Sequence, residues 1–261
     1  MSSMKCLFFA SLVACGNTTG GAIVSFGFAA AGPKDASEGA LSFTNQLGYS
    51  VTLQKAVLHI GAVYLNQTVP TSGAQETSCI LPGTYVAQSL SSLKVNLLSS
   101  ALQKFPEPGQ GAETEAKVGE VWLSGGEINN TEDRTVIFEA AGNALLSGQN
   151  YPFEARITIS QNRVIPTKDP AYPGANPICK QRIVTPIFLD LTPRQGGTLV
   201  VRIDPRTIFG TIDFATIPKV SDSPPLFRFS DRNDNPADIQ LFQNGLRSRA
   251  QVYSFSWQQQ E

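Results

Sequence analysis

The sequence predicts an all-β protein: an antiparallel β-sandwich, immunoglobulin-like or of a related Greek-key kind, with few short helices. Runs of residues with high β-propensity recur along the chain and are bounded by Gly, Pro and Asn. Residues 153–159 and 252–257 alternate apolar and polar side chains with the period of two that indicates half-buried strands. No long amphipathic helix is evident, which argues against an alternating βαβ architecture.

Strands are expected wherever such a run lies between turn residues. They span residues 39–44, 50–64, 85–98, 118–124, 134–139, 151–160, 182–191, 197–203, 211–214 and 250–257. Helical signals are confined to residues 90–105, where leucines at helical spacing leave room for one or two turns, and to residues 241–246. Strands at this spacing favour a sandwich or a barrel.

Composition limits the classes of partner. The 261 residues are 41% hydrophobic, which is enough for a packed core. Charged residues make up 16% of the chain, against about 25% in an average soluble domain. The formal net charge is −1 and no long basic run occurs, so the sequence offers no electrostatic footprint for nucleic acid.

The N-terminus has the features of an export signal. Lys5 supplies a positive charge, and residues 6–14 form an apolar run that is too short to span a bilayer, which needs about 20 residues. The run ends in Leu12-Val13-Ala14-Cys15, which resembles the lipobox of bacterial lipoproteins. The resemblance covers residues 1–15. It implies a signal peptide over residues 1–14, cleavage before Cys15, and acylation of the Cys15 thiol and the new N-terminus with chains such as palmitate.

This resemblance implies a place in the cell envelope. Several acyl chains anchor a protein stably, since each buried methylene contributes about 0.8 kcal/mol. Gly16, rather than Asp, follows the lipid cysteine, which resembles the pattern sent to the outer membrane in enteric bacteria. Residues 15–38 are then a flexible tether and residues 39–261 the folded domain. Two alternatives are a buried N-terminal strand or helix, and an ordinary secretory signal cut near residues 29–31, against which the polar stretch 16–21 argues.

The remaining cysteines predict a disulfide. Cys6 leaves with the signal peptide and Cys15 carries lipid, so Cys79 and Cys179 are an even pair in an oxidising compartment. Their bond would close a loop of about one hundred residues, contributing up to about 4.7 kcal/mol in the chain-entropy model. A metal site or a reactive thiol is the rival interpretation, but the pair lacks CxxC spacing.

A proline-rich loop precedes Cys179. Residues 164–177 contain four prolines and no strand pattern, so we expect a long loop at 164–178 that the disulfide staples to the body. The alternative is a boundary between two subdomains.

His59 is the only histidine in the chain and lies in a run that is apolar on both faces. It is interpreted as a core or rim histidine of a central strand rather than a catalytic residue, because no GxSxG motif accompanies it.

Asp204 and Asp213 could form an acid–base pair, but turn chemistry and an ion pair with Arg206 are the favoured interpretation. Glu120, Glu127, Glu132 and Asp133 are expected to be surface charges. Trp122 and Trp257 could stack on sugars, although buried strand positions are the commoner case.

The densest cluster of oxygen ligands lies at residues 231–238. It contains Asp231, Asn233, Asp234, Asn235 and Asp238. A hard cation such as Ca²⁺ takes six to eight oxygens from such loops, so these residues form a candidate calcium site. Residues 231–235 resemble the calcium-binding linker motif of cadherins, although Pro236 follows one residue too early and the partner motifs are missing. The alternative is an Asx-rich turn before the last strand.

Together these patterns predict a membrane-anchored, exported lipoprotein with a non-enzymatic binding or structural role in the cell envelope. Its partners would be the membrane, through the lipid, and an envelope protein or small ligand recognised by loops. The alternative is an envelope hydrolase that uses paired carboxylates, with or without Ca²⁺. Transition-metal binding is disfavoured by one histidine and two methionines.

Overall fold

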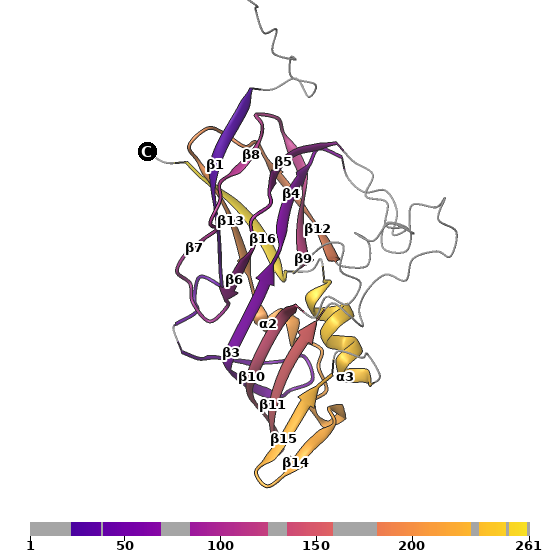
Figure 1. Ribbon diagram of the computed structural model, residues 1–261. Helices are drawn as coiled ribbons and strands as arrows, with labels where there is room; N and C mark the ends of the chain where they lie inside the picture. Colours follow the sequence, from indigo (N-terminus) through magenta and orange to yellow (C-terminus); the bar gives the residue numbers. More distant parts are fainter. Residues whose placement is uncertain are drawn as a thin grey trace, which may run out of the picture.

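The structure is a computed structural model, and it describes residues 22–37, 39–68, 84–124, 135–158, 182–230, 235–248 and 251–259. Most of these residues form strands, which are arranged in two sheets (Figure 1). The few helices are short. The expectation of an all-β, sandwich-like fold is confirmed. Among the described residues, no helix is long and apolar enough to cross a membrane.

The first sheet has nine strands in the described part of the chain. Its order is β12 (Arg182–Leu191), β9 (Ala116–Ser124), β4 (Ala62–Asn66), β5 (Tyr85–Ser89), β8 (Gly109–Ala112), β1 (Ile23–Ala31), β13 (Thr198–Ile203) and β16 (Tyr253–Gln258), with β7 (Gln103–Lys104) paired to β1. Alternate residues face the core, as Val121 and Leu123 of β9 do. The intervening residues form what we call the outer face.

This sheet curls until its two edges approach each other. The edge strands β12 and β16 are in contact. At the crossing lies Gly119 of β9, where an added Cβ would come within 2.7 Å of both Leu189 of β12 and Phe255 of β16. A glycine therefore lets three strands meet closely across the interior of the curled sheet, because an added Cβ would force the ends of both side chains to shift.

The second sheet has seven strands in the described part. Its order is β14 (Lys219–Asp222), β15 (Pro225–Phe229), β11 (Gln149–Thr158), β10 (Val136–Leu146), β3 (Ser50–Ile60) and β2 (Leu41–Thr44), with β6 (Leu93–Asn96) paired to β3. The chain crosses between the sheets at Gly61, where β3 ends and β4 begins. The start of β1 and the β14–β15 hairpin lie at opposite ends of an elongated molecule (Figure 1).

Short helices cover one face of the second sheet. They are α2 (Pro205–Ile208), the 3₁₀ helix η3 (Phe214–Thr216), α3 (Pro236–Ile239) and the π-helix η4 (Gln240–Leu246). Phe209 and Phe214 pack on Phe153 of β11, with ring centroids 5.5 and 4.9 Å apart. These rings belong to one continuous hydrophobic cluster that extends through both sheets.

Several expected elements differ from the observed ones. The strand expected at 211–214 is wrong, because Asp213 accepts a hydrogen bond from the amide of Ala215 and starts η3 there. The expected strand 50–64 is divided at Gly61, and residues 90–105 form strands and turns rather than a helix. The turn expected at 241–246 is confirmed as η4. The sheets are mixed rather than purely antiparallel, because β1 pairs with β13, and β11 with β15, in parallel.

The boundary expected at residue 39 is also wrong. Ile23–Ala31 form β1, between β8 and β13 in the first sheet. Val24, Phe26 and Phe28 point into the core and are at most 4% exposed. The tether was assigned because residues 15–38 follow the lipobox, whereas alternation with period two makes residues 23–31 a strand. The folded domain therefore includes residues that were assigned to the tether.

Candidate functional site

Several expected site residues lie outside the described residues. They are Cys15, Cys79, Cys179, Asp231, Asn233 and Asp234, together with the proline-rich loop at 164–178. Lipidation of Cys15 and the Cys79–Cys179 disulfide therefore stay predictions.

Asn235 and Asp238, from the candidate calcium cluster, cap α3. The amide of Asp238 donates to Oδ1 of Asn235 at 3.0 Å, and the Asn235 side-chain amide donates to Oδ2 of Asp238. Asp238 is 1% exposed, and its Oδ1 accepts from the amide of Ser230 at 2.9 Å. Both carboxylate oxygens of Asp238 are thus engaged by the protein. The described ranges hold no group of three His, Cys, Asp or Glu residues suited to a metal ion, and the calcium site stays a prediction.

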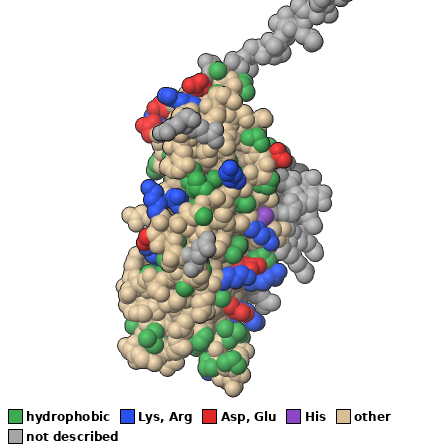
Figure 2. All heavy atoms as spheres, turned by 90° about the vertical axis from the view of Figure 1, so that its left-hand side faces the viewer, with side chains coloured by type: hydrophobic (Ala, Val, Ile, Leu, Met, Phe, Trp, Pro, Cys, Tyr) green, Lys and Arg blue, Asp and Glu red, His purple; other side chains and the backbone are tan. Residues whose placement is uncertain are grey.

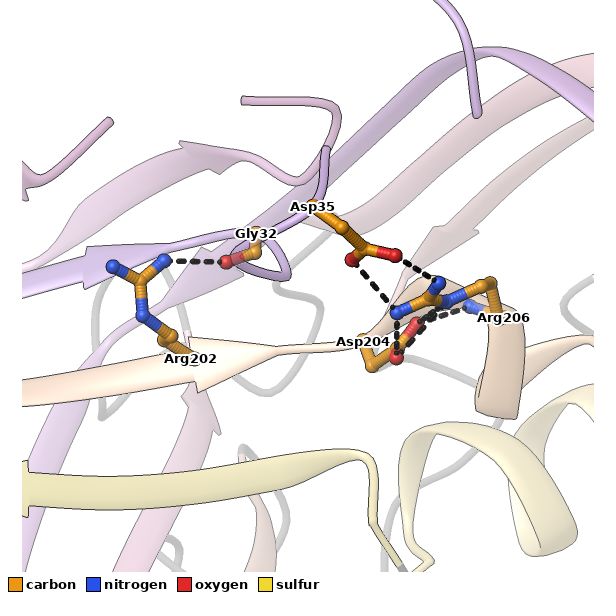
Figure 3. Close-up of polar contacts among 5 residues, drawn as sticks. All are labelled: Gly32, Asp35, Arg202, Asp204 and Arg206. Carbon is orange, nitrogen blue, oxygen red and sulfur yellow. Dashed lines mark hydrogen bonds and ion pairs between the residues drawn. The ribbon is translucent and has the colours of Figure 1, made fainter. Parts of the chain in front are cut away.

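Asp204 and Asp213 also act as helix caps. Asp204 accepts a hydrogen bond from the amide of Arg206 at 2.9 Å and pairs with its guanidinium at 2.7 Å (Figure 3). The same guanidinium pairs with Asp35 at 2.7 Å and lowers the pKa of the Asp35 carboxyl. The pairing of Asp204 with Arg206 is the favoured sequence interpretation, and it is confirmed.

Glu120 is not the surface charge that was expected. It is 2% exposed on the outer face of β9, and its Oε2 accepts from Trp122 Nε1 at 3.0 Å and from the Tyr85 hydroxyl at 3.2 Å. The ring of Tyr64 lies 4.4 Å from that of Trp122. Trp122 is therefore a buried strand residue that donates to a buried acid, and not an exposed platform for a sugar.

His59 lies in a strand, as expected, whereas Trp257 is a strand residue that is half-buried rather than buried. His59 lies in β3, within the second sheet, opposite Lys94 of β6. Trp257 of β16 packs edge-on against Phe26 of β1, with ring centroids 5.4 Å apart.

A groove that the sequence did not predict lies over β1, β13 and the end of β16. Its volume is about 380 Å³, and its floor includes Gly27 and Ala29 of β1 and Thr198 of β13. Gly27 pairs with Thr198 in the parallel register. Because Phe26 and Phe28 face the core, only small side chains of β1 face outward here, and they leave the space empty. We call this the outer groove.

The wall of the outer groove is the segment of residues 102–108. Phe105 fixes this wall, because its amide donates to the carbonyl of Phe28 at 2.9 Å and its ring stacks on Phe28 at 4.0 Å. Leu102, which is 39% exposed, adds an apolar surface. Lys104 and Glu107 add one charge of each sign. Figure 2 shows the side of the molecule that carries β7, where basic and apolar side chains lie side by side.

The outer groove has the size and lining of a small-ligand site. Such sites typically measure about 300–1,000 Å³ and combine an apolar lining with a few polar groups. Among the described residues that line it, Glu107 is the one carboxylate, whereas glycoside-type acid–base catalysis uses a pair. The alternating small residues at 27, 29 and 31 were the one signal that could have revealed its floor.

Comparisons with known proteins give little further information. No family model matches the chain, and no curated protein matches it. Among solved structures, the chain is similar to MbnP from Methylosinus trichosporium, with 12% sequence identity and a TM-score of 0.40 over 90% of this chain and 98% of that one. A TM-score of 0.40 is too low to indicate a shared fold.

Proposed function

We propose that this protein is an exported lipoprotein of the cell envelope, most simply of the outer membrane, and that it binds a small amphipathic ligand without catalysis. The observation that carries the binding role is the outer groove, which offers an apolar floor beside Lys104 and Glu107. The lipobox-like residues 12–15 supply the location.

The position of β1 supports an anchor close to the folded domain. Residues 16–22 separate Cys15 from the first residue of β1. Fully extended, this stretch spans at most about 25 Å, since each residue adds up to about 3.6 Å. The start of β1 would then face the membrane, and the β14–β15 hairpin at the other end of the molecule would point away from it (Figure 1).

A binding role has more support than the alternative, an envelope hydrolase. A hydrolase of the glycosidase kind needs two carboxylates about 5–10 Å apart across a cleft. Asp204 and Asp213 are the N-caps of α2 and η3. Glu120 accepts hydrogen bonds from Tyr85 and Trp122. These contacts give each carboxylate a structural role instead of leaving it free for substrate.

The anchor is tested by metabolic labelling with an alkyne analogue of palmitate. We expect label on the wild type and none on Cys15→Ser, which should also leave the membrane fraction or keep its leader. Cys6→Ser is the matched control, because it removes a thiol from the leader and should leave labelling unchanged. Equal labelling of the wild type and Cys15→Ser would contradict the anchor.

The groove is tested with the fluorescent probe 8-anilinonaphthalene-1-sulfonate, which has an apolar ring system and one negative charge. Leu102→Ser should weaken saturable probe binding at least about fivefold, because a partly buried leucine contributes on the order of 1 kcal/mol to an apolar contact. Leu145→Ser is the matched control, since Leu145 is 44% exposed and lies in β10 of the second sheet. Equal effects of the two variants would place the probe elsewhere and reject the outer groove.

A further inference from the structure

We propose that a second pocket, separate from the outer groove, binds a small oxyanion through a phosphoryl or carboxylate group. This pocket has a volume of about 230 Å³ and lies where β13 ends and β16 begins. Its polar lining residues are Lys34, Arg202, Asp204, Gln251 and Ser254. We call it the Arg202 pocket.

Arg202 is a cation in a fixed position. Its Nη1 donates to the carbonyl of Gly32 at 2.9 Å (Figure 3) and to that of Ser100 at 3.1 Å. These bonds hold the guanidinium against neutral carbonyls, and no carboxylate among the described residues pairs with it. Its positive charge is therefore not compensated locally.

Asp204, the carboxylate of the pocket, is already neutralised. Both of its oxygens accept hydrogen bonds from Arg206, at 2.9 Å from the backbone amide and at 2.7 Å from Nη2. Arg206 also forms an ion pair with Asp35. Its hydrogen bonds to Asp204 and Asp35 raise the pKa of its guanidinium. With Lys34 and Arg202 included, these five side chains leave one positive charge in excess at neutral pH.

The remaining polar groups can donate hydrogen bonds. Lys34, Gln251 and Ser254 are exposed, and none of their side chains has a hydrogen-bond partner within the described ranges. Gln251 has a φ of 63°, which is uncommon for a residue other than glycine. This backbone conformation turns the chain at one wall of the Arg202 pocket. Charged and neutral donors thus outnumber free acceptors in a small concave site. An oxyanion supplies the missing acceptors and the missing charge at once.

The Arg202 pocket and the outer groove can be tested independently. Thr198 lines the groove and Arg202 lines the pocket, four positions further along β13, which corresponds to about 13 Å along a strand. Leu102 belongs to the groove, whereas Lys34 and Ser254 belong to the pocket. A variant of one site therefore leaves the other intact, and the failure of one proposal does not imply the failure of the other.

The test is isothermal titration of the purified protein with inorganic phosphate and, separately, with succinate, against sodium chloride at matched ionic strength. We expect saturable heat from at least one oxyanion at concentrations up to about 10 mM, a range that covers dissociation constants near about 1 mM. Lys34→Gln should weaken that binding roughly tenfold, because it removes a charge-assisted hydrogen-bond donor. Ser254→Ala should weaken it by less. Lys94→Gln, which removes an exposed lysine on β6, should have no effect.

Each outcome decides the proposal. Binding of phosphate without succinate would identify a phosphoryl group, and the reverse would identify a carboxylate. Absence of saturable heat from both anions, or equal weakening by Lys34→Gln and Lys94→Gln, would overturn it. Arg202 also donates hydrogen bonds to the carbonyls of Gly32 and Ser100, so its replacement could destabilise the fold. Arg202→Lys therefore serves as a second variant only if its melting temperature matches that of the wild type.

Discussion

The hydroxyl of Tyr49 donates a hydrogen bond to Oδ1 of Asp213, and the two oxygen atoms are 2.6 Å apart. Tyr49 is 2% exposed and lies between β2 and β3, whereas Asp213 caps η3. The Tyr49 ring also packs on Phe214, with centroids 5.3 Å apart. This contact joins a turn of the second sheet to the helical segment that covers it, across more than 160 residues of sequence.

The Tyr49–Asp213 contact predicts a loss of stability at alkaline pH. Burial, followed by the hydrogen bond to Asp213, raises the pKa of the Tyr49 hydroxyl from 10.0 to about 12. The folded state therefore favours the protonated phenol. Its contribution is complete below pH 10 and is lost as the pH rises towards 12. Urea denaturation at a series of pH values should show a steeper decline above pH 10 for the wild type than for Tyr49→Phe. Parallel declines would contradict this role of Tyr49.

The close contacts around Gly119 predict that a larger side chain at this position destabilises the protein. In Gly119→Val, the new side chain would meet Leu189 and Phe255, so we expect a loss of about 1–3 kcal/mol in the free energy of unfolding, as overpacking produces. Chemical denaturation measures this loss. Ser256→Val, on the exposed outer face of β16, is the control and should change stability by less than about 0.5 kcal/mol. Equal losses in both variants would show that β9, β12 and β16 do not meet at Gly119.

If Cys79 and Cys179 form a disulfide, replacing either cysteine should have the same effect on stability. In the mature protein, denatured without reductant, neither Cys79 nor Cys179 should react with a thiol label. Cys79→Ser, Cys179→Ser and the double variant should all lose the same stability, up to about 4.7 kcal/mol, because each removes the same bond. Each single variant should also expose one reactive thiol. Labelling of the wild type, or additive losses, would exclude the disulfide.

The cap at α3 predicts a calcium-independent role for Asp238. Asp238→Ala leaves the amide of Ser230 and the side chain of Asn235 without this acceptor, so we expect a loss of about 1–3 kcal/mol. The loss should be equal in EDTA and in Ca²⁺ when melting temperatures are compared. A loss that occurs only in Ca²⁺ would contradict the cap and would instead support the ion site at residues 231–238.

Local patterns were sufficient for most strands of the second half of the chain. Residues 153–159 and 252–257 alternate in the sequence, and they lie in or overlap β11 and β16, because alternation reports directly which side of a strand is buried. The same alternation is present in β1, but these residues were assigned to a tether because they follow the lipobox. The strand expected at 211–214 failed because Asp213 can cap a helix start, and this local hydrogen bond outweighs the β-propensity of its neighbours.

The outer groove and the Arg202 pocket could not be predicted from the sequence. Gly27 and Thr198 are far apart in the chain and meet only through a parallel pairing that no local pattern encodes. Glu120 was expected at the surface, since an isolated acidic residue normally is exposed, yet Tyr85 and Trp122 satisfy it in a buried position.

By itself, the sequence determined that this chain is rich in β-strands, where most of its strands lie, and how its first fifteen residues resemble an acylation signal. These properties depend on neighbouring residues, which interact regardless of how the rest of the chain folds. Tertiary structure decided that Ile23–Ala31 belong to the first sheet, that the sheet curls over Gly119, and that two hollows form along β13. The physical reason is that burial and hollows depend on which distant segments pack together, and that choice minimises the exposed apolar surface of the whole chain.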